Sequence, residues 1–431
     1  MTSTVTLTNS DDLSNNKLQP CDRAFHDWYR FVLSYPPHLV QHYINQFGLD
    51  NDAVLLDPFC GTGTTMVEAK KHGLASIGVE AVPMSHFACS TKVQWAVDLQ
   101  VLQQAQARVL KRFQKRVNQP PWLEFNAEQV AIMMKNAIFP KPLHKCLVLR
   151  EAIAMEPSDP VRHVFNLALA YVAVNDASNL KFGPEVGIRR SKREDAPVFE
   201  RWQEKIGQMV EDLAGHTGLA HVSARCHRGD ARGLRSLLEP HSIDAIITSP
   251  PYPNEKDYTR TTRLESVLLG FLQNKADLRA FKQSLIRSNT RNVYTVDDDD
   301  RYLASESPVT EIAQAIEERR IALKKTSGFE RLYHRVTTLY FGGMKRHLTA
   351  LQPSLKPGSQ LAYVVGDQAS FFQVMIRTGE LLAEIAEEVG YQVQDIDLFR
   401  TRLATATGAQ LREEVVILKW PGHPKQSKYF A

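Results

Sequence analysis

The stretch Asp57-Pro-Phe-Cys-Gly-Thr-Gly-Thr-Thr65 constrains the fold of this 431-residue chain more than any other. It follows Ala53–Leu56, an apolar run typical of a buried parallel strand, and proline ends such a strand because it cannot donate to a sheet ladder. The two glycines of the stretch allow a tight turn and let backbone N–H groups approach a ligand closely. The helix predicted from Thr64 directs its N-terminus to the same place. The sequence therefore predicts a strand, a glycine turn and a helix, as in nucleotide-binding α/β units.

An acidic residue ends the next predicted strand. The apolar run Ala75–Val79 is followed by Glu80, about twenty residues after the glycine turn, where βαβ nucleotide folds place the carboxylate that binds ribose hydroxyls. A phosphate-binding P-loop would need a Gly-Lys-Ser/Thr ending, which is absent. The pattern favours a nucleoside-containing cofactor.

A second constrained turn, Thr248-Ser-Pro-Pro-Tyr252, leaves the predicted strand Ser242–Ile247 at its carboxyl end, where open α/β sheets place their ligands. Its two prolines stiffen the turn and leave the carbonyls of Ser249 and Pro250 as acceptors, which suit an amino group. Tyr252 offers a flat face on which an extruded base could stack. The alternative for this turn taken alone is a rigid proline corner.

Together these stretches resemble motifs I and IV of the amino-methylating DNA methyltransferases, which use S-adenosylmethionine and modify N4 of cytosine or N6 of adenine. Phe25–Tyr29 and Ser34–Val40 resemble motif X, which helps to close over the methionine end of the cofactor, and Arg228–Ala231 resembles motif III. The resemblance implies an α/β fold with a Rossmann-like class I methyltransferase sheet, helices on both faces and a mainly helical insert.

The resemblance also implies the site residues. Cofactor contacts are expected from Asp57, Pro58, Phe59, Cys60, Gly61, Thr62, Gly63, Thr64, Thr65, Glu80, Asp230, Ala231, His26 and Tyr35. Catalytic positions are expected at Ser249, Pro250, Pro251 and Tyr252, with no metal. Serine at the first catalytic position resembles the N4-cytosine enzymes, since N6-adenine enzymes more often carry Asp or Asn there. An N6-adenine enzyme, an RNA base methyltransferase and an inactive nucleic-acid-binding protein of this fold stay open as alternatives.

Six segments follow from these motifs. Residues 1–22 are expected to form a flexible tail, 23–83 the motif X and cofactor-binding part, and 84–218 a helical insert and candidate DNA-recognition region. Residues 219–253 carry motifs III and IV, 254–335 a helical, basic insert beside the target-base pocket, and 336–431 the last part of the catalytic domain. The cations of Arg189–Arg193, with Arg287 and Arg291, are candidates for phosphate contacts, and the acidic run Asp297–Asp300 is expected on the outer surface.

Composition sets the outer limits. The net charge of +4 permits a polyanionic partner such as double-stranded DNA, and a companion restriction endonuclease is a further candidate partner. The five cysteines show no Cys-x-x-Cys pair, so a reducing compartment and no structural metal form the simplest interpretation. No stretch approaches the roughly twenty apolar residues of a membrane helix, and no secretory signal is evident. A cytoplasmic, nucleoid-associated protein is expected.

Overall fold

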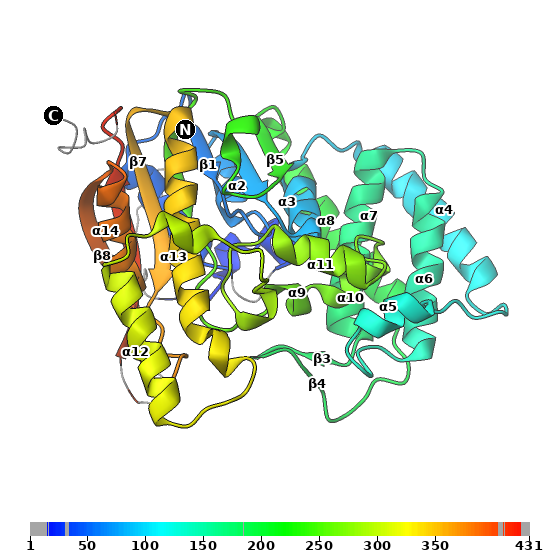
Figure 1. Ribbon diagram of the computed structural model, residues 1–431. Coiled ribbons are helices and arrows are strands. Elements are labelled where there is room, and N and C mark those ends of the chain that lie inside the picture. Colours follow the sequence, from blue (N-terminus) through cyan, green and yellow to red (C-terminus); the bar gives the residue numbers. More distant parts are fainter. Residues whose placement is uncertain are drawn as a thin grey trace.

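The fold is built on a seven-stranded sheet (Figure 1). The structure, a computed structural model, describes residues 15, 17–30, 34–183, 185–403, 408 and 410–423. In spatial order the strands are β5 (Ala224–Arg228), β2 (Ala75–Glu80), β1 (Val54–Asp57), β6 (Ile243–Thr248), β7 (Leu355–Gly366), β9 (Gln410–Lys419) and β8 (Gln392–Leu403). The first five are mutually parallel, and β9 runs antiparallel to both of its neighbours. The predicted class I methyltransferase sheet, with its terminal antiparallel pair, is confirmed.

Fourteen α-helices are the other main elements of the described residues. They are α1 (Pro37–Gln46), α2 (Thr64–Lys71), α3 (Pro83–Val93), α4 (Leu99–Arg116), α5 (Ala127–Ile132), α6 (Pro140–Ala154), α7 (Asp159–Val172), α8 (Val198–Gly215), α9 (Tyr258–Thr261), α10 (Arg263–Leu268), α11 (Lys275–Gln283), α12 (Pro308–Ala322), α13 (Tyr333–Leu351) and α14 (Thr378–Glu388). A short hairpin, β3 (Leu180–Lys181) with β4 (Gly187–Ile188), projects from the helical part.

Alternating side chains of the central strands enter two separate cores, because successive residues of a strand point to opposite faces. Leu55 of β1 packs with Ala245 and Ile247 of β6 in the core covered by α1. Their neighbours Leu56 and Ile246 pack on the other face, in the core covered by α13 and α14. Helices thus cover both faces of the sheet, as predicted.

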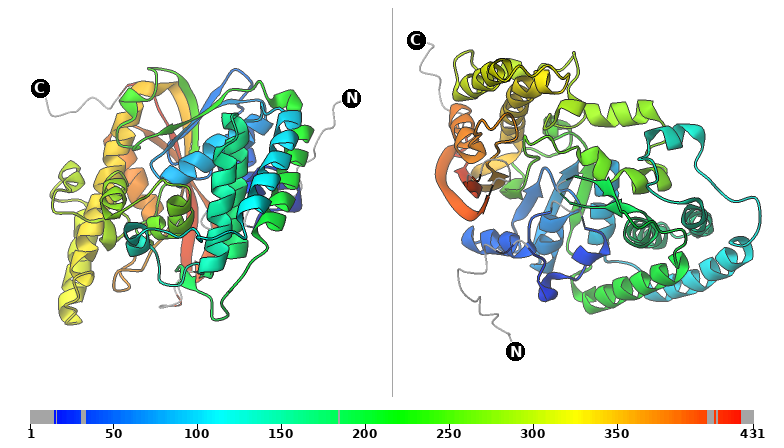
Figure 2. Two further views of the ribbon diagram at one scale, coloured as in Figure 1. Left: turned by 90° about the vertical axis from the view of Figure 1, so that its right-hand side faces the viewer. Right: turned by 90° about the horizontal axis from the view of Figure 1, so that it is seen from below.

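The segment between β2 and β5 forms a helical lobe beside the sheet (Figures 1 and 2). Helices α3, α4, α6, α7 and α8 share one apolar core, in which Trp202 is fully buried and its indole N–H donates to the Phe165 carbonyl at 3.0 Å. Sequence periodicity predicts helices at Trp95–Val117, Val161–Val174 and Val198–Leu213, which correspond to α4, α7 and α8. It does not predict α3 or α5, nor does it predict α6. That helix buries nine residues spread around much of its circumference and so lacks a single apolar stripe, the pattern that identifies an amphipathic helix.

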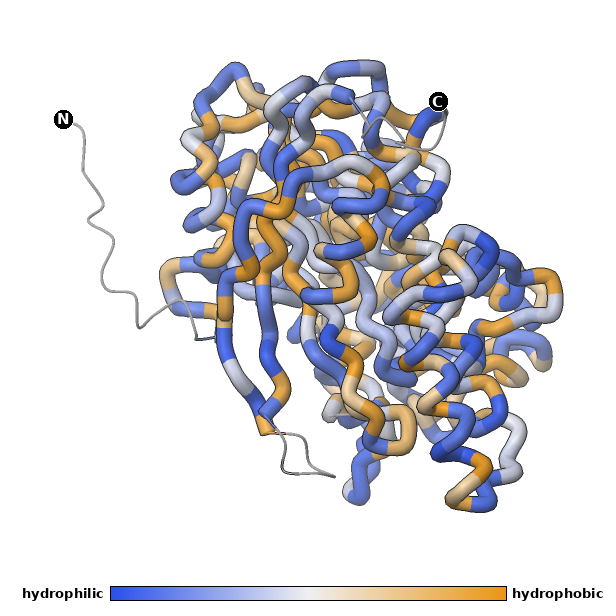
Figure 3. The backbone as a smooth tube through the Cα atoms, turned by 60° about the vertical axis from the view of Figure 1, so that its left-hand side comes forward, coloured by the Kyte–Doolittle hydropathy of each residue, from blue (hydrophilic) through white to orange (hydrophobic). Residues whose placement is uncertain are grey.

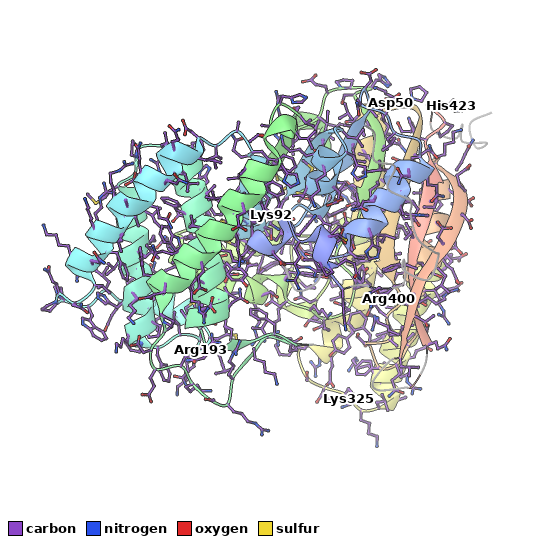
Figure 4. All side chains as sticks on the ribbon, turned by 180° about the vertical axis from the view of Figure 1, so that it is seen from behind. Asp50, Lys92, Arg193, Lys325, Arg400 and His423 are labelled. Atoms are coloured by element: carbon purple, nitrogen blue, oxygen red, sulfur yellow. The ribbon has the colours of Figure 1, made fainter. Side chains whose placement is uncertain are left out.

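The carboxyl ends of the parallel strands face the lower side of the molecule. In Figure 4 Asp50, just before β1, lies at the top, whereas Arg193 of the lobe and Lys325 after α12 lie at the bottom. The ends of β8 and β9 that flank residues 404–409 extend in the same direction (Figure 3). The turns after β1 and β6 leave adjacent strands at this edge. The order of the strands along the chain reverses between these two strands, and α/β sheets bind their ligands at such a point.

One expectation about the chain outside the sheet was wrong, and a second is covered only in part by the described residues. The acidic run is not wholly on the surface, because Asp297 and Asp299 are buried in ion pairs with Arg287 and Arg232 respectively. Most of the predicted tail, residues 1–14 and 16, lies outside the described residues. Its last part, Pro20–Asp22, forms a 3₁₀ helix with Asp22 buried, so ordered structure begins before residue 22.

Candidate functional site

A cavity of about 380 Å³ lies at the carboxyl edge of the sheet and joins the two constrained turns. Its wall includes Pro58–Thr62 from the turn after β1 and Ser249–Tyr252 from the turn after β6. Glu80 at the end of β2 and Asp230 after β5 complete the side next to the glycine turn. The two stretches, nearly two hundred residues apart in the chain, therefore form one site.

Asp57 holds the turns together from beneath the cavity. Its fully buried carboxylate accepts hydrogen bonds from the Phe59 backbone N–H at 3.1 Å, the Thr248 hydroxyl at 2.6 Å and the Tyr35 hydroxyl at 3.1 Å. Burial raises the pKa of Asp57 to about 6, against the effect of these hydrogen bonds. One side chain thus fixes the glycine turn, the end of β6 and the motif X segment relative to each other.

Glu80 stands at the cofactor side of the cavity. Its carboxylate accepts from the Gly61 N–H at 2.8 Å and the Val82 N–H at 2.6 Å, and burial raises its pKa to about 8. Both backbone donors fix the orientation of the carboxylate, and Gly61 adopts a φ of +51° that favours glycine. A carboxylate in this position suits a pair of ribose hydroxyls.

Asp230 and Ala231 line the same side. The Asp230 carboxylate receives a two-pronged ion pair from the Arg232 guanidinium, which also bonds to buried Asp299. The Ala231 carbonyl accepts a hydrogen bond at 2.8 Å from the buried His347 ring, whose other nitrogen contacts the Tyr363 hydroxyl. These contacts fix the backbone of the motif III segment.

The diproline turn presents acceptors on the opposite side. The Ser249 hydroxyl donates to the Val364 carbonyl of β7 at 3.1 Å, so its lone pairs remain as acceptors. The Tyr252 backbone N–H donates to the Tyr258 hydroxyl at 3.2 Å, and the Tyr252 ring lies against Gly366 at the end of β7. A Cβ at Gly366 would come within 3.1 Å of that ring, so glycine makes room for it.

Sequence patterns missed several lining residues. Gly366 is one of them, and the others include Arg400, Arg402 and Glu413 from β8 and β9. Both arginines pair with Glu413. The β8–β9 residues lie some 150 positions after the turn and carry no motif, so only sheet pairing brings them there. Lys256 lies in the polar stretch Pro253–Arg260, which the sequence predicts to border the pocket, and it does line the cavity.

Four predicted cofactor residues do not line the cavity. Asp57 and Thr65 lie beneath it, and the Thr65 hydroxyl bonds to Tyr35 and to the Ile247 carbonyl. Gly63 packs against Cys89, with a φ of +90°. The His26 side chain is buried, and its Nε2 lies 2.7 Å from the Glu68 carboxylate on α2. Burial lowers the pKa of His26 to about 4. Tyr35 does reach the cavity.

The candidate phosphate contacts divide into three groups. Arg287 is buried and paired with Asp297 at 2.7 Å, so it supports the loop and is not available to a phosphate. In the run Arg189–Arg193, three cations bond to backbone carbonyls, while Arg190 is exposed. Arg291 is exposed and stacks over the Phe329 ring.

Three cysteines that lie far apart in the sequence meet behind the glycine turn. Cys60 of the turn, Cys89 of α3 and Cys226 of β5 have sulfur atoms within 4.8 Å of one another. Sequence spacing gave no sign of this group.

Fold and cavity together define the class of the protein. A sheet of this order, with a glycine turn after β1, a carboxylate at the end of β2 and a diproline turn after β6, is that of a class I methyltransferase with S-adenosylmethionine as cofactor. No helix in the described part of the chain is long and apolar enough to cross a membrane.

Comparison with known proteins gives one family match and distant relatives. Residues 9–84 match the family N6_N4_Mtase, described as DNA methylase. Type II methyltransferase M.BsoBI of Geobacillus stearothermophilus is 25% identical over 412 residues, covering 86% of this chain and 79% of that protein. Type II methyltransferase M.AvaI of Nostoc sp. is 24% identical over 409 residues, covering 88% and 81%. Residues 9–84 thus match the N6/N4 amino DNA methylase family that the motifs predicted, and the chain is distantly similar to type II methyltransferases over most of its length.

Among solved structures, TrmN from Thermus thermophilus matches with a TM-score of 0.32 and 12% identity. The match covers 92% of this chain and about half, 52%, of that one. A score this low carries no argument about function.

Proposed function

We propose that this DNA methyltransferase transfers a methyl group from S-adenosylmethionine to N4 of a cytosine rotated out of duplex DNA. The observation that carries the proposal is the single cavity shared by the glycine turn and Ser249–Tyr252, because methyl transfer requires donor and acceptor side by side. Serine at the first catalytic position favours cytosine N4 over adenine N6.

The residues on the cofactor side fit a nucleoside with an amino-acid tail. Glu80 would accept hydrogen bonds from ribose hydroxyls, and the wall segment at Asp230 would face the adenine ring. Tyr35 and the backbone of the glycine turn would border the methionine end. When bound, S-adenosylmethionine supplies an electrophilic methyl group on a sulfonium centre.

The residues on the other side orient the amine. The Ser249 hydroxyl and the Pro250 carbonyl would accept hydrogen bonds from the N4 hydrogens, which directs the nitrogen lone pair away from them and towards the methyl donor. Tyr252 would stack on the base and hold its plane. The transferred group forms an N–C bond as its S–C bond breaks, and the N4 proton leaves to solvent. Positioning supplies most of the rate enhancement, with no covalent enzyme intermediate.

The duplex would lie across the lower side of the molecule. Arg193 of the helical lobe and Lys325 after α12 lie near the bottom of Figure 4, on the side of the carboxyl strand edge, and Arg400 of β8 lies above them and lines the cavity. Residues 84–218 and 254–335 would share sequence recognition, because both segments leave the sheet at that edge. A companion restriction endonuclease and action at the chromosome fit a type II modification enzyme.

Two substitutions test the assignment. Tyr252→Ala and Ser249→Ala should abolish methyl transfer to duplex DNA while binding of S-adenosylhomocysteine, measured by calorimetry, changes by no more than a few fold. Ser236→Ala removes an exposed serine hydroxyl outside the cavity and should behave as wild type. Full activity of both cavity variants would refute the site.

Mass spectrometry of nucleosides from methylated DNA identifies the base. N4-methylcytosine is the expected product. N6-methyladenine would place the enzyme in the other branch of the family, methylation of transfer RNA in preference to duplex DNA would make it an RNA enzyme, and no transfer to any of them would favour an inactive binding protein.

A further inference from the structure

The Cys60–Cys89–Cys226 cluster lies outside the proposed chemistry but next to the cofactor site. Cys60 belongs to the glycine turn and also lines the cavity, Cys89 lies in the middle of α3, and Cys226 lies on the edge strand β5. Cys60 and Cys89 are buried, and Cys226 is half-buried. Three segments separated by 29 and by more than a hundred residues are thus joined at one point.

The dimensions of the sulfur triangle fit a metal ion. The Cys60 sulfur lies 3.7 Å from that of Cys89 and 3.5 Å from that of Cys226, and the third side is at most 4.8 Å. The centre of such a triangle lies at most about 2.4 Å from each sulfur, against about 2.3 Å for a Zn–S bond. An ion could therefore bind all three sulfurs with little movement of the backbone.

A buried ammonium supplies a second, independent observation. Lys92, one helical turn after Cys89, is 1% exposed, and its only hydrogen bond among the described residues is to the His26 carbonyl at 3.4 Å. No carboxylate of the described residues forms an ion pair with it, and because an unpaired buried charge is costly, burial lowers the pKa of Lys92 to about 7, whereas negative charge on Cys89 raises it. Figure 4 shows Lys92 in the interior, between the sheet and the helical lobe.

Charge balance selects the kind of ion. Three thiolates around a divalent ion leave one net negative charge, which the Lys92 ammonium would offset. A monovalent ion would leave two negative charges against one positive, in a mostly buried site. Thiolate ligands in turn select soft or borderline ions over magnesium or calcium.

We propose that Cys60, Cys89 and Cys226 form a binding site for a divalent thiophilic ion of the zinc type. Binding displaces the thiol protons to solvent and leaves the oxidation state of sulfur unchanged. The ion would tie the glycine turn to α3 and β5 and so fix the backbone that faces the cofactor.

His86 is a neighbouring imidazole that lies outside the three-sulfur group, so it would have to move to become a fourth ligand. It lies one turn before Cys89 on α3, and its Nε2 contacts the Cys226 carbonyl at 3.1 Å. The site does not depend on the base that the enzyme methylates, and its test does not require activity.

The test titrates chelator-treated, fully reduced protein with Cd²⁺, whose thiolate complexes absorb in the ultraviolet. The expected result is a charge-transfer band that saturates at one equivalent. Cys60→Ser, Cys89→Ser and Cys226→Ser should each weaken binding by more than about a hundredfold, beyond the range found for outer-shell residues. Cys146→Ser removes an equally buried thiol outside the cluster and should leave the titration unchanged. His86→Ala should weaken binding less than the serine variants.

X-ray absorption of the zinc-loaded wild-type protein keeps the proposal testable if the serine variants fail to fold. A first shell containing three sulfur atoms near 2.3 Å supports the site. A shell of only nitrogen and oxygen, or a Cd²⁺ titration without a saturating band, would show that the three thiols are packing groups and would overturn the proposal.

Discussion

The charge on Glu80 should control cofactor affinity near neutral pH. Burial raises the pKa of this carboxyl from an ordinary value of 4.5 to about 8, so the unliganded protein keeps it largely protonated at pH 6 to 7. Ribose hydroxyls donate more strongly to the ionised form, so cofactor binding should expel a proton. Affinity should then rise with pH by at most about tenfold per unit and level off above pH 8.

Calorimetry with S-adenosylhomocysteine, which lacks the sulfonium charge, measures this coupling. In buffers of different ionisation enthalpy the wild type should release close to one proton per binding event at pH 6.5 and almost none at pH 9. Glu80→Gln should bind more weakly, with little pH dependence and no proton release. Equal proton release in wild type and variant, or affinity independent of pH in the wild type, would refute the role of Glu80.

Ionisation of Glu80, which should raise cofactor affinity, should lower the stability of the unliganded protein. Between pH 4.5 and about 8 the folded chain holds a proton that the unfolded chain has released. The contribution of Glu80 to the free energy of unfolding is therefore fully present below pH 4.5 and is lost as pH rises through the window. The loss is at most about 1.4 kcal/mol per pH unit, or about 5 kcal/mol in all. Urea unfolding of wild type and Glu80→Gln at several pH values measures it.

Three further substitutions test the structure. Gly366→Ala should lower kcat and leave cofactor affinity within a few fold, because the new methyl would displace the Tyr252 ring; Gly207→Ala, where a Cβ meets nothing within 4 Å, is the matched control. Arg287→Ala should lower the free energy of unfolding in urea by about 3 to 5 kcal/mol, because Asp297 would stay buried without its partner; a loss of DNA binding with unchanged stability would restore the phosphate-contact role. Trp202→Ala should cost about 3 to 5 kcal/mol by the same measurement, since it empties the centre of the helical lobe, and a cost under about 1 kcal/mol would contradict the packing of that lobe.

The strands of the sheet could be predicted because each is marked by residues within one short stretch of sequence. Each central strand is a short apolar run with a turn signal at its end, so Ala53–Leu56 and Ser242–Ile247 were placed within a residue or two of β1 and β6. The two site turns contain their own proline and glycine constraints, so their position at the strand ends could be predicted without long-range information.

Long-range pairing explains what the sequence did not reveal. Arg287 and the aspartates after it looked like a phosphate contact and a surface charge run. Whether such charges face solvent or each other depends on how the loop before α12 packs on α13, where Gly342 touches the Asp299 backbone. The cysteine cluster and the contribution of β8 and β9 to the cavity depend in the same way on strand and helix neighbours that no sequence window contains.

The strand order also explains why this sheet accommodates two long insertions without losing its site. β5 is an edge strand, so the helical lobe between β2 and β5 does not interrupt the pairing of β1 with β6 that brings the two turns together. The second insertion lies between β6 and β7, which still pair directly. Both insertions leave the sheet after carboxyl ends of strands, at Glu80 and Thr248, so both must begin beside the cavity. This placement is why we propose that the two segments recognise the DNA sequence: changes within them would alter the DNA contacts while the turns at the cavity keep their neighbours.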